Sequence, residues 1–386
     1  MKRQVTLILL AILSVSASFA DGLMPFVPSN PPAMKPLPAG RTPAYVSAQG
    51  FRHGVNLGNY LEFTAGMSGV QVSAREFRLM RVEGFDHVRV PVAWSQYTGP
   101  GPEYLLPEGI FGRVDWVITN ALNQQLSVIV DVHHFRELNA DPSGQADRLS
   151  AIWKQVAAHY ADYPNKLAFE ILNEPCDQAT ADKMNPIYDR VIREIRGSNP
   201  HRTIFVDTCD WASIVQLNTL VLPPDDNLVV EVHCYDPFYF THQGASWGGA
   251  DVQVRGIQFP GPPAKPLEID PGLKLQPYVL RWMTNYNTLP AEKNPSGPAA
   301  FLEKLAFARA WSDHYGRPVY VGEFGCYTTA DPESRVRYYK AFREALDAQK
   351  LGWAVWDWSA GFNYWDKTKG QPVAGMREAL FPSSRK

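Results

Sequence analysis

The chain has 386 residues, a formal net charge of −2 and no basic block, so its charge does not favour binding to nucleic acid or to an anionic membrane surface. Aromatic residues make up 12% of the chain and include 11 Trp, which would suit a groove that stacks against the flat faces of an uncharged ligand. Length alone does not fix the number of domains, because an α/β barrel can occupy roughly 200 to 400 residues as one unit.

The first twenty residues have the form of a secretory signal peptide. Lys2 and Arg3 precede an apolar run from Val5 to Val15, and small residues follow up to Ala20. This run is shorter than the roughly 20 residues that a membrane span needs, and no later stretch is long and apolar enough to span. We therefore expect cleavage near Ala20 and a secreted mature protein, extracellular or periplasmic, that is not held in a membrane.

The pattern after this segment predicts one barrel. Residues 21–46 are rich in Pro and lack periodicity, as expected of an extended N-terminal arm. From Phe51 onward, short β-rich runs alternate with helical segments, which is typical of repeated βα units around a parallel sheet. The predicted strands are Arg52–Leu57, His87–Val92, Ser127–His133, Leu167–Asn173, Thr203–Asp207, Leu228–His233, Pro318–Glu323 and Gly352–Trp358. Eight such strands close a (β/α)8 TIM barrel, so we expect a signal peptide at 1–20, an arm at 21–46 and a single barrel domain at 47–386.

The connections between these strands carry helix signals. Ser73 is a plausible N-cap of a run through Glu83, and Gly84 is a plausible C-cap. Further predicted helices cover Gly109–Gln125, Gln145–Tyr160, Ala179–Arg196, Pro298–Tyr315 and Pro332–Gln349. The segment Thr241–Gly297, after the sixth strand, is dense in Gly and Pro and too long for a routine connection. We expect this loop excursion to form one wall of a cleft beside the active face.

Four cysteines lie at or just after four successive strand ends: Cys176, Cys209, Cys234 and Cys326. In an oxidising compartment they could pair, but four cysteines allow three connectivities and buried free thiols are equally ordinary. Their spacing matches no zinc pattern.

Two strand-like segments end at glutamates. The run from Phe169 leads to Asn173 and Glu174, and the run from Pro318 leads to Glu323. The C-terminal ends of barrel strands converge on one face, so we expect Glu174 and Glu323 to meet there. Two such carboxyl groups are what glycosidic bond cleavage requires.

The same rule gathers a polar cluster that a purely structural core would not tolerate without a use. Its expected members are Asn59, Glu62, Arg89, His133, His134, Asn173, Glu174, His233, Tyr235, Glu323 and Trp356. Arg89 should lower the pKa of Glu323, and Tyr235 should donate a hydrogen bond to it. Partial burial and repulsion should raise the pKa of Glu174. Asn173 is placed to bind the sugar 2-hydroxyl, and His133 and His233 to hold hydroxyls and the acid in register.

At these residues the chain resembles glycoside hydrolase family 5, from about Phe51 to Phe381. The ordered motifs that carry the resemblance are Asn173–Pro175, Gly322–Gly325 and Glu231–Pro237, supported by Asn56–Asn59, Val88–Pro91, Asp131–His134 and Gly352–Trp356. The resemblance implies that Glu174 is the proton donor and later the base, Glu323 the nucleophile, and Trp356 the platform beneath the sugar. It also implies a retaining endo-β-1,4-glucanase that acts on a polysaccharide or oligosaccharide without metal or organic cofactor, and we expect a monomer.

Some of these residues could also have a purely structural role. Glu170 is our example of a glutamate that is a solvated loop residue or a salt-bridge partner. His134, next to His133 and so pointing away from it on a strand, could be a core or loop histidine. Trp356 could belong to the core. A metal site built from Asp131, His133 and His134 lacks any HExxH-like spacing.

Three other kinds of function are considered at this point: a different glycosidase, a carbohydrate-binding protein and a serine esterase. A β-mannanase or β-glucosidase could use the same barrel, since subsite loops decide the substrate. A noncatalytic carbohydrate-binding barrel is disfavoured, because a binder has no need of two buried acids. Gly244–Gly248 matches the G-x-S-x-G pattern of serine esterases around Ser246, but a Gly-rich loop surrounds it instead of a strand and a helix. In that loop Trp247 could instead stack over a sugar.

Overall fold

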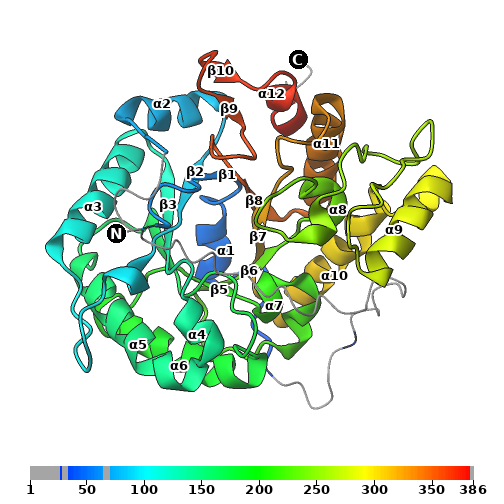
Figure 1. Ribbon diagram of the computed structural model, residues 1–386. Helices are drawn as coiled ribbons and strands as arrows, with labels where there is room; N and C mark the ends of the chain where they lie inside the picture. The colour runs from blue at the N-terminus through cyan, green and yellow to red at the C-terminus, as the bar shows by residue number, and fades with distance from the viewer. Residues whose placement is uncertain (1–26, 28–33, 64–69, 383–386) are drawn as a thin grey trace, which may run out of the picture.

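Eight parallel strands form a closed barrel in the order β1 to β8 (Figure 1). The computed structural model describes residue 27 and residues 34–63 and 70–382. The strands are β1 His53–Asn56, β2 His87–Val90, β3 Ser127–Asp131, β4 Leu167–Glu170, β5 Ile204–Asp207, β6 Leu228–His233, β7 Val319–Phe324 and β8 Gly352–Val355. The predicted (β/α)8 barrel is therefore confirmed. β2, β3, β4 and β8 end two or three residues earlier than predicted, because the residues that follow leave the sheet and enter the loops of the active face.

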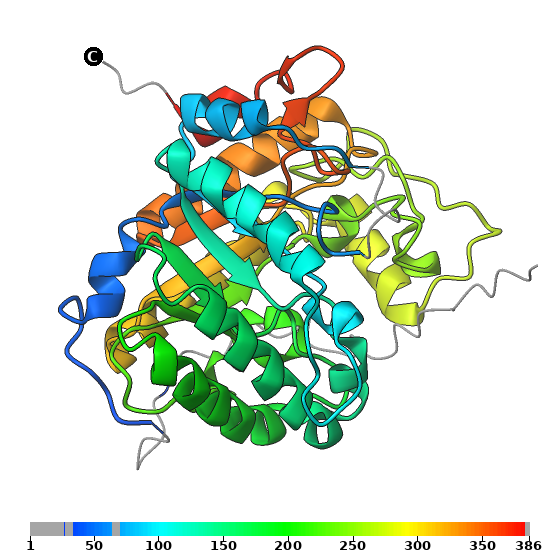
Figure 2. The ribbon, with the colours of Figure 1, turned by 90° about the vertical axis from the view of Figure 1, so that its left-hand side faces the viewer.

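Helices surround this barrel and cover its outer face (Figures 1 and 2). The α-helices are α1 Pro43–Ala48, α2 Ala74–Glu83, α3 Glu108–Asn123, α4 Arg136–Ala140, α5 Pro142–His159, α6 Ala181–Ser198, α7 Cys209–Ala212, α8 Phe238–Thr241, α9 Pro277–Thr288, α10 Ala299–Tyr315, α11 Pro332–Gln349 and α12 Met376–Leu380. Short 3-10 turns η1 to η4 cover Trp94–Tyr97, Ile214–Thr219, Ala250–Val252 and Ala291–Lys293, and a small hairpin joins β9 Trp365–Asp366 to β10 Gln371–Pro372. All six predicted helices are present.

The end signals of α2 have the predicted physical basis. The backbone N–H and the hydroxyl of Ser73 both donate to the Glu76 carboxylate, at 2.7 and 2.6 Å. The helix stops at Gly84, whose φ of 112° lies in the region that favours glycine. Local chemistry therefore fixes both ends of this helix.

The excursion after β6 contains more regular structure than its Gly and Pro content predicts. It holds η3, α9 and η4 and projects from one side of the barrel (Figure 2). Within α9, the rings of Trp282 and Tyr286 stack at 5.6 Å, and Trp282 also contacts Tyr239 from α8 at 5.2 Å. These aromatic contacts join the excursion to the barrel.

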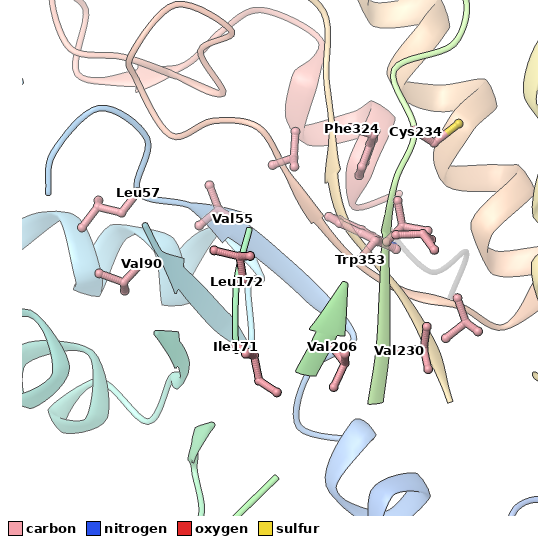
Figure 3. Packing of buried hydrophobic residues seen from close by; sticks show 14 of the residues in the cluster. Val55, Leu57, Val90, Ile171, Leu172, Val206, Val230, Cys234, Phe324 and Trp353 are labelled. Carbon is pink, nitrogen blue, oxygen red and sulfur yellow. The ribbon is translucent and has the colours of Figure 1, made fainter. Parts of the chain in front are cut away.

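Side chains alternate between the two faces of each strand, and each face has its own core. Val90, Val206 and Val230 point outward into the large apolar cluster under the helices (Figure 3). The inward residues form a smaller apolar floor inside the barrel: Ala44, Phe51, Ile129, Ala168, Phe205, Val229, Tyr320 and Ala354. Ala44 comes from α1, which therefore closes the N-terminal end of the barrel.

A layer of acids lies directly above this floor. Ile129 and Ala168 pair in the sheet, and two residues later Asp131 pairs with Glu170. Phe205 and Val229 pair likewise, and two residues later Asp207 pairs with Glu231. All four acids are fully buried. The strand period thus places four carboxyl groups at one level inside the barrel, just below the active face.

The structure bears unequally on the predictions about the N-terminus, membrane spans and cysteines. The predicted signal peptide at 1–20 and most of the arm up to residue 33 lie outside them and remain predictions. None of the helices in the described part of the chain has the length and apolar character needed to cross a bilayer. All four cysteines are buried and free.

Arg202 ties the chain together at the lower end of the barrel, where it is almost fully buried. Its guanidinium donates to four backbone carbonyls, those of Tyr160, Tyr163, Pro164 and Leu167, at 2.7 to 2.9 Å. Residues on this face of a barrel serve stability more than chemistry. Tyr160 and Pro164 also accept backbone N–H groups, so Arg202 adds a second donor there and a side-chain donor at the other two carbonyls.

We expect Arg202→Met to lower the free energy of unfolding by about 3 kcal/mol, because several buried carbonyls lose their donors. Urea denaturation would measure the change. Arg190→Met is the matched control, since Arg190 pairs only with the exposed Asp147 and its loss should cost less than about 0.5 kcal/mol. Equal losses in the two variants would contradict this role for Arg202.

Candidate active site

Glu174 and Glu323 lie close together at the C-terminal end of the barrel. Glu323 is on β7, and Glu174 follows β4 in a left-handed conformation with φ 48°. The backbone N–H of Glu174 donates to Asp207 Oδ2 at 2.9 Å, which fixes this turn. His233 Nδ1 lies 2.8 Å from Glu174 Oε1 and 3.7 Å from Glu323 Oε2. One oxygen of each glutamate and one nitrogen of His233 therefore lie within 4.8 Å of one another.

Arg89 is the centre of the buried charge. Its guanidinium is fully buried, and Nη1 donates to Glu323 Oε1 at 2.8 Å. Nε and Nη2 each donate to Glu170 at 2.6 Å, and Nη2 also donates to Asn173 Oδ1 at 2.7 Å. Of the two interpretations of Glu170, the solvated loop residue is wrong, because the side chain is buried inside the barrel, and the salt-bridge partner is confirmed by its pair with Arg89.

Two further acids share the same guanidinium. Asp131 lies 3.1 Å from Nη2, and Glu231 lies 3.2 Å from Nε. Burial raises the pKa of Asp131 to about 7 and the pKa of Glu231 well above its usual range, despite the attraction of Arg89. One cation cannot neutralise all these carboxylates, so some of them hold protons at neutral pH.

The expected lowering of the Glu323 pKa by Arg89 is outweighed. Burial raises the pKa of Glu323 to about 7, while His233, Arg89 and the Tyr235 hydroxyl act in the opposite direction. The guanidinium acts less strongly than expected because its charge is shared with Glu170 and other acids. The Tyr235 hydroxyl donates to Glu323 Oε2 at 2.7 Å, as expected from the sequence.

The partners of Glu174 differ from those of Glu323. Burial raises the pKa of Glu174, while His134 and Arg89 lower it. Repulsion by Glu323, which the sequence suggested, is not among its main causes. Burial also lowers the pKa of His233 to about 4, so this imidazole is neutral near pH 7. Glu174 thus faces a neutral ring, whereas Glu323 faces a guanidinium and a phenol.

His133, His134, Glu62 and Asn59 line the β1 and β3 side of the site. His133 Nδ1 lies 2.8 Å from Asp131 Oδ2, and His134 Nε2 lies 3.5 Å from Glu62 Oε2. The backbone N–H of Asn59 donates to Glu62 Oε1 at 2.5 Å. Burial lowers the pKa of His134, but its bond to Glu62 raises the pKa further, so the net shift is upward.

The expectation that His134 points away from His133 is wrong. β3 ends at Asp131, so strand alternation no longer applies, and the two rings lie 4.3 Å apart. Glu62, His133 and His134 could each offer one ligand atom to a metal ion. Asp131, proposed in the sequence-based alternative, is not in this group, and its oxygens bond instead to the Val92 backbone N–H and to His133.

Aromatic rings flank these polar groups. Trp356 follows β8, is half-buried, and lies nearly parallel to the His133 ring, with centroids 6.0 Å apart and an interplanar angle of 9°. Trp247, 47% exposed in the excursion, contacts Tyr327 at 4.8 Å. Phe362 lies 5.5 Å from Tyr327 and 5.9 Å from Tyr235. We call Tyr235, Trp247, Tyr327 and Phe362 the aromatic wall, because they run from Glu323 to the surface.

The G-x-S-x-G match has no hydrolase geometry. Ser246 lies exposed in a turn, with neither a strand before it nor an α-helix directly after it. The nucleophile elbow of a serine esterase needs both. The structure therefore offers no support for a serine esterase.

Sequence reasoning did not single out Asn56, Asp207 or Glu231 as site residues. Asn56 accepts a bond from Arg89 Nη1 at 3.0 Å, and Asp207 holds the backbone of Glu174. A signal for Glu231 was present, since it stands two residues before His233 in the same strand and so shares its inward face. A charged residue inside an apolar strand marks that face.

Comparisons with known proteins agree with this geometry. The family model described as Cellulase (glycosyl hydrolase family 5) matches residues 63–361. Endoglucanase H of Acetivibrio thermocellus is 28% identical over 79% of this chain and 29% of its own length. Endoglucanase 3 of Fibrobacter succinogenes is 27% identical over 86% of this chain and 53% of its own length. The chain thus spans about half or less of these two relatives.

Solved structures resemble the whole barrel. Endoglucanase Cel5A of Thermotoga maritima has a TM-score of 0.76 and 32% identity, covering 88% of this chain and 99% of its own. Other structures of Cel5A, with TM-scores of 0.75 and 32% identity, hold cellobiose or mannotriose and cover 87% of this chain and 99% of theirs.

We expect Arg89→Met to lower the free energy of unfolding by about 3 to 5 kcal/mol at pH 8, because buried carboxylates lose their cation. The loss should shrink at pH 5, where the carboxyl groups, whose pKa values rise without the cation, can take up protons. Urea denaturation at both pH values would measure it. Arg193→Met, which breaks an exposed pair with Asp189, is the control. A loss that does not depend on pH would contradict the central role of Arg89.

Proposed function

The chain belongs to glycosyl hydrolase family 5, the cellulase family, and on this basis we propose that it hydrolyses internal β-1,4 bonds of a glucan with retention of anomeric configuration. The observation that carries the proposal is the spacing of Glu174 and Glu323, whose oxygens lie within 4.8 Å of each other and of His233. Retaining glycosidases hold their two carboxyl groups about 5 to 5.5 Å apart, whereas inverting enzymes leave about 6.5 to 9.5 Å for a water molecule.

Glu323 is the proposed nucleophile. Arg89 donates to one of its oxygens and Tyr235 to the other, at 2.8 and 2.7 Å, and both bonds favour the ionised form. An ionised oxygen of Glu323 attacks the anomeric carbon, and the bond to the leaving sugar oxygen breaks. The result is a glycosyl ester on Glu323.

Glu174 is the proposed acid in the first step and the base in the second. With Glu323 buried, Glu174 half-buried and the two carboxyl groups close, the pair shares protons and titrates as a unit. The donors on Glu323 place the negative charge there and leave the proton on Glu174. Once the ester forms, the charge of Glu323 is gone, so the pKa of Glu174 falls and its carboxylate can take a proton from the attacking water.

The remaining polar and aromatic groups are proposed to bind the sugar. Trp356 offers a flat face next to His133, and Asn173 is held by Arg89 near the position of the 2-hydroxyl. Trp247 presents an exposed ring in the aromatic wall. The other proposed sugar contacts are Asn59, Glu62, His133, His134 and His233. Their hydrogen-bonding atoms and rings suit an uncharged polyhydroxylated ligand.

We propose that the substrate is a β-1,4-glucan and that the chain acts as a secreted monomer without metal or organic cofactor. Carboxyl groups and hydrogen-bond donors already provide every group that double displacement needs. β-Mannan is a second candidate substrate, because Thermotoga maritima Cel5A has been solved with mannotriose as well as with cellobiose.

We expect the protein to release reducing ends from soluble cellulose derivatives faster than from mannan or from an aryl glucoside. Proton NMR during early hydrolysis of a cello-oligosaccharide should show the β anomer first, because two displacements restore the configuration. Initial appearance of the α anomer would refute the proposed double displacement.

Glu323→Ala tests the assignment of the nucleophile. The variant should lose more than about 10³-fold in turnover but still bind the oligosaccharide in calorimetry, since it lacks only the nucleophile. Glu333→Ala is the matched control, because Glu333 lies exposed at the start of α11. Unchanged turnover in Glu323→Ala would favour another nucleophile, and no hydrolysis by the unmodified protein would favour a carbohydrate-binding barrel.

We expect Tyr235→Phe to shift the acidic limb of the kcat/KM profile to higher pH by about one unit. The Tyr235 hydroxyl lowers the pKa of Glu323, so its removal raises that pKa and protonates the nucleophile at higher pH. Rates measured from pH 4 to 9 would show this shift. Tyr327→Phe, in the same aromatic wall, should leave the limb in place. A shift to lower pH would contradict the bond's proposed role.

A further inference from the structure

His233 connects Glu174 to a carboxyl group deeper in the barrel. Its Nδ1 lies 2.8 Å from Glu174 Oε1, and its Nε2 lies 3.6 Å from Glu231 Oε1. His233 and Glu231 are both buried. Within the described part of the chain, neither His233 Nε2 nor the oxygens of Glu231 have a hydrogen-bond partner of good geometry. Nε2 therefore faces a carboxyl oxygen whose other neighbouring donor is Arg89 Nε, at 3.2 Å.

The two nitrogens of His233 cannot both carry hydrogen near neutral pH. Burial lowers the pKa of His233 to about 4, so the neutral ring has one N–H and one lone pair. If Nε2 carries the hydrogen, Nδ1 can only accept a bond from Glu174. If Nδ1 carries it, the ring donates to Glu174 and turns a lone pair toward Glu231. The tautomer therefore determines which protonation state of Glu174 is favoured.

We propose that Glu231 is a positioning residue for Glu174. It holds His233 in the tautomer with hydrogen on Nε2, so that Nδ1 accepts a hydrogen bond from the carboxylic acid of Glu174. This inference rests on the proposed acid role of Glu174. It assigns a function in the reaction to a fully buried residue that touches no substrate.

The surroundings of Glu231 fix it as an acceptor. Gly322 on β7 makes room for it, since a Cβ on Gly322 would lie 1.6 Å from Glu231 Oε1. Burial and Glu170 raise the pKa of Glu231 well above its usual range, so it is neutral. Arg89 Nε lies 3.2 Å from Oε1, so we place the proton of Glu231 on Oε2. Oε1 is then a carbonyl-type oxygen that faces the Nε2–H of His233.

This arrangement favours protonated Glu174. A carboxylic acid donates well to the Nδ1 lone pair at 2.8 Å, whereas a carboxylate would face that lone pair without a hydrogen between them. Glu174 therefore keeps its proton in the resting site, and the O–H turns from Nδ1 to the leaving sugar oxygen when that oxygen takes the proton. The other charged or titratable groups that face Glu174 or His233 include Arg89, His133, His134, Glu170, Cys176, Asp207, Tyr235 and Glu323.

A second carboxylate–histidine pair provides an internal reference. Asp131, the last residue of β3, and His133 have the same spacing in the sequence, but there Asp131 Oδ2 lies 2.8 Å from Nδ1. That contact favours hydrogen on Nδ1 of His133. The two histidines of the site are thus expected to hold opposite tautomers, each set by the acid two residues before it.

Long-range ¹H–¹⁵N NMR of histidine-labelled protein near pH 7 would test the tautomer directly. For His233 we expect a protonated Nε2 and an unprotonated Nδ1, and for His133 the reverse. His233→Asn would serve only to assign the signals. A protonated Nδ1 in His233 of the free protein would overturn the proposal. This measurement needs no activity, so its outcome is separate from that of the proposed function.

Kinetics of Glu231→Leu would test the consequence. Without the acceptor, His233 can donate from Nδ1 to Glu174, which lowers the pKa of Glu174 and shifts the alkaline limb of kcat/KM down by about one unit. Hydrolysis of phenyl β-cellobioside, which needs an acid, should fall about tenfold at pH 7. The dinitrophenyl glycoside, whose leaving group needs no proton, should change less than about twofold.

Glu231→Gln is the matched control. Its amide can donate to Glu170 and accept from His233, so it should retain the wild-type dependence on the leaving group and the wild-type alkaline limb. Equal losses of Glu231→Leu on both glycosides would indicate a structural role alone and overturn the proposal, as would no loss on either. If the unmodified protein hydrolyses neither glycoside, the proposed function fails instead.

Discussion

A single buried guanidinium among several carboxyl groups is the constraint on which the site depends. Arg89 bonds to Glu170 and Glu323 and approaches Asp131 and Glu231, all within the barrel. Removing these charges from water is costly, so the barrel must supply donors or protons for each of them. The available donors are unequally distributed, and this inequality separates the two proposed catalytic acids. Glu323 has a cation and a phenol, whereas Glu174 has a neutral imidazole.

The strand period explains how a barrel can hold such a layer. Inward positions two residues apart change from apolar to acidic along the same strands, as from Ile129 to Asp131 and from Val229 to Glu231. The apolar floor keeps water out from below, and the loops of the active face open above. The acids therefore lie in a medium of low dielectric constant, while Glu174 and Glu323 lie at the active face, where the substrate is proposed to bind. Stability and reactivity come from adjacent layers of one sheet.

Much of this could be predicted from sequence, for identifiable reasons. The eight strands follow from β-rich runs, and α2 follows from its end residues, because both depend on local chemistry. Glu174, Glu323 and Arg89 were found because strand ends of a barrel converge. The mutual orientation of His133 and His134 was not predicted, since it depends on where β3 stops. The burial of Glu170 was not predicted either, because it requires knowing which residues of β4 point into the barrel. Short helices such as α4 and α8 depend on tertiary contacts, and α9 lies in a segment rich in Gly and Pro.

The excursion Thr241–Gly297 has an evolutionary consequence. It carries Trp247 at the outer end of the aromatic wall, yet it contributes none of the groups that bond to Glu174 or Glu323. Insertions, deletions or recombination in this segment can therefore reshape the outer binding surface and leave the reaction centre intact. Under the proposed function, such a division would let a lineage change its substrate at little risk to its chemistry, and it marks the excursion as the natural graft point for engineering.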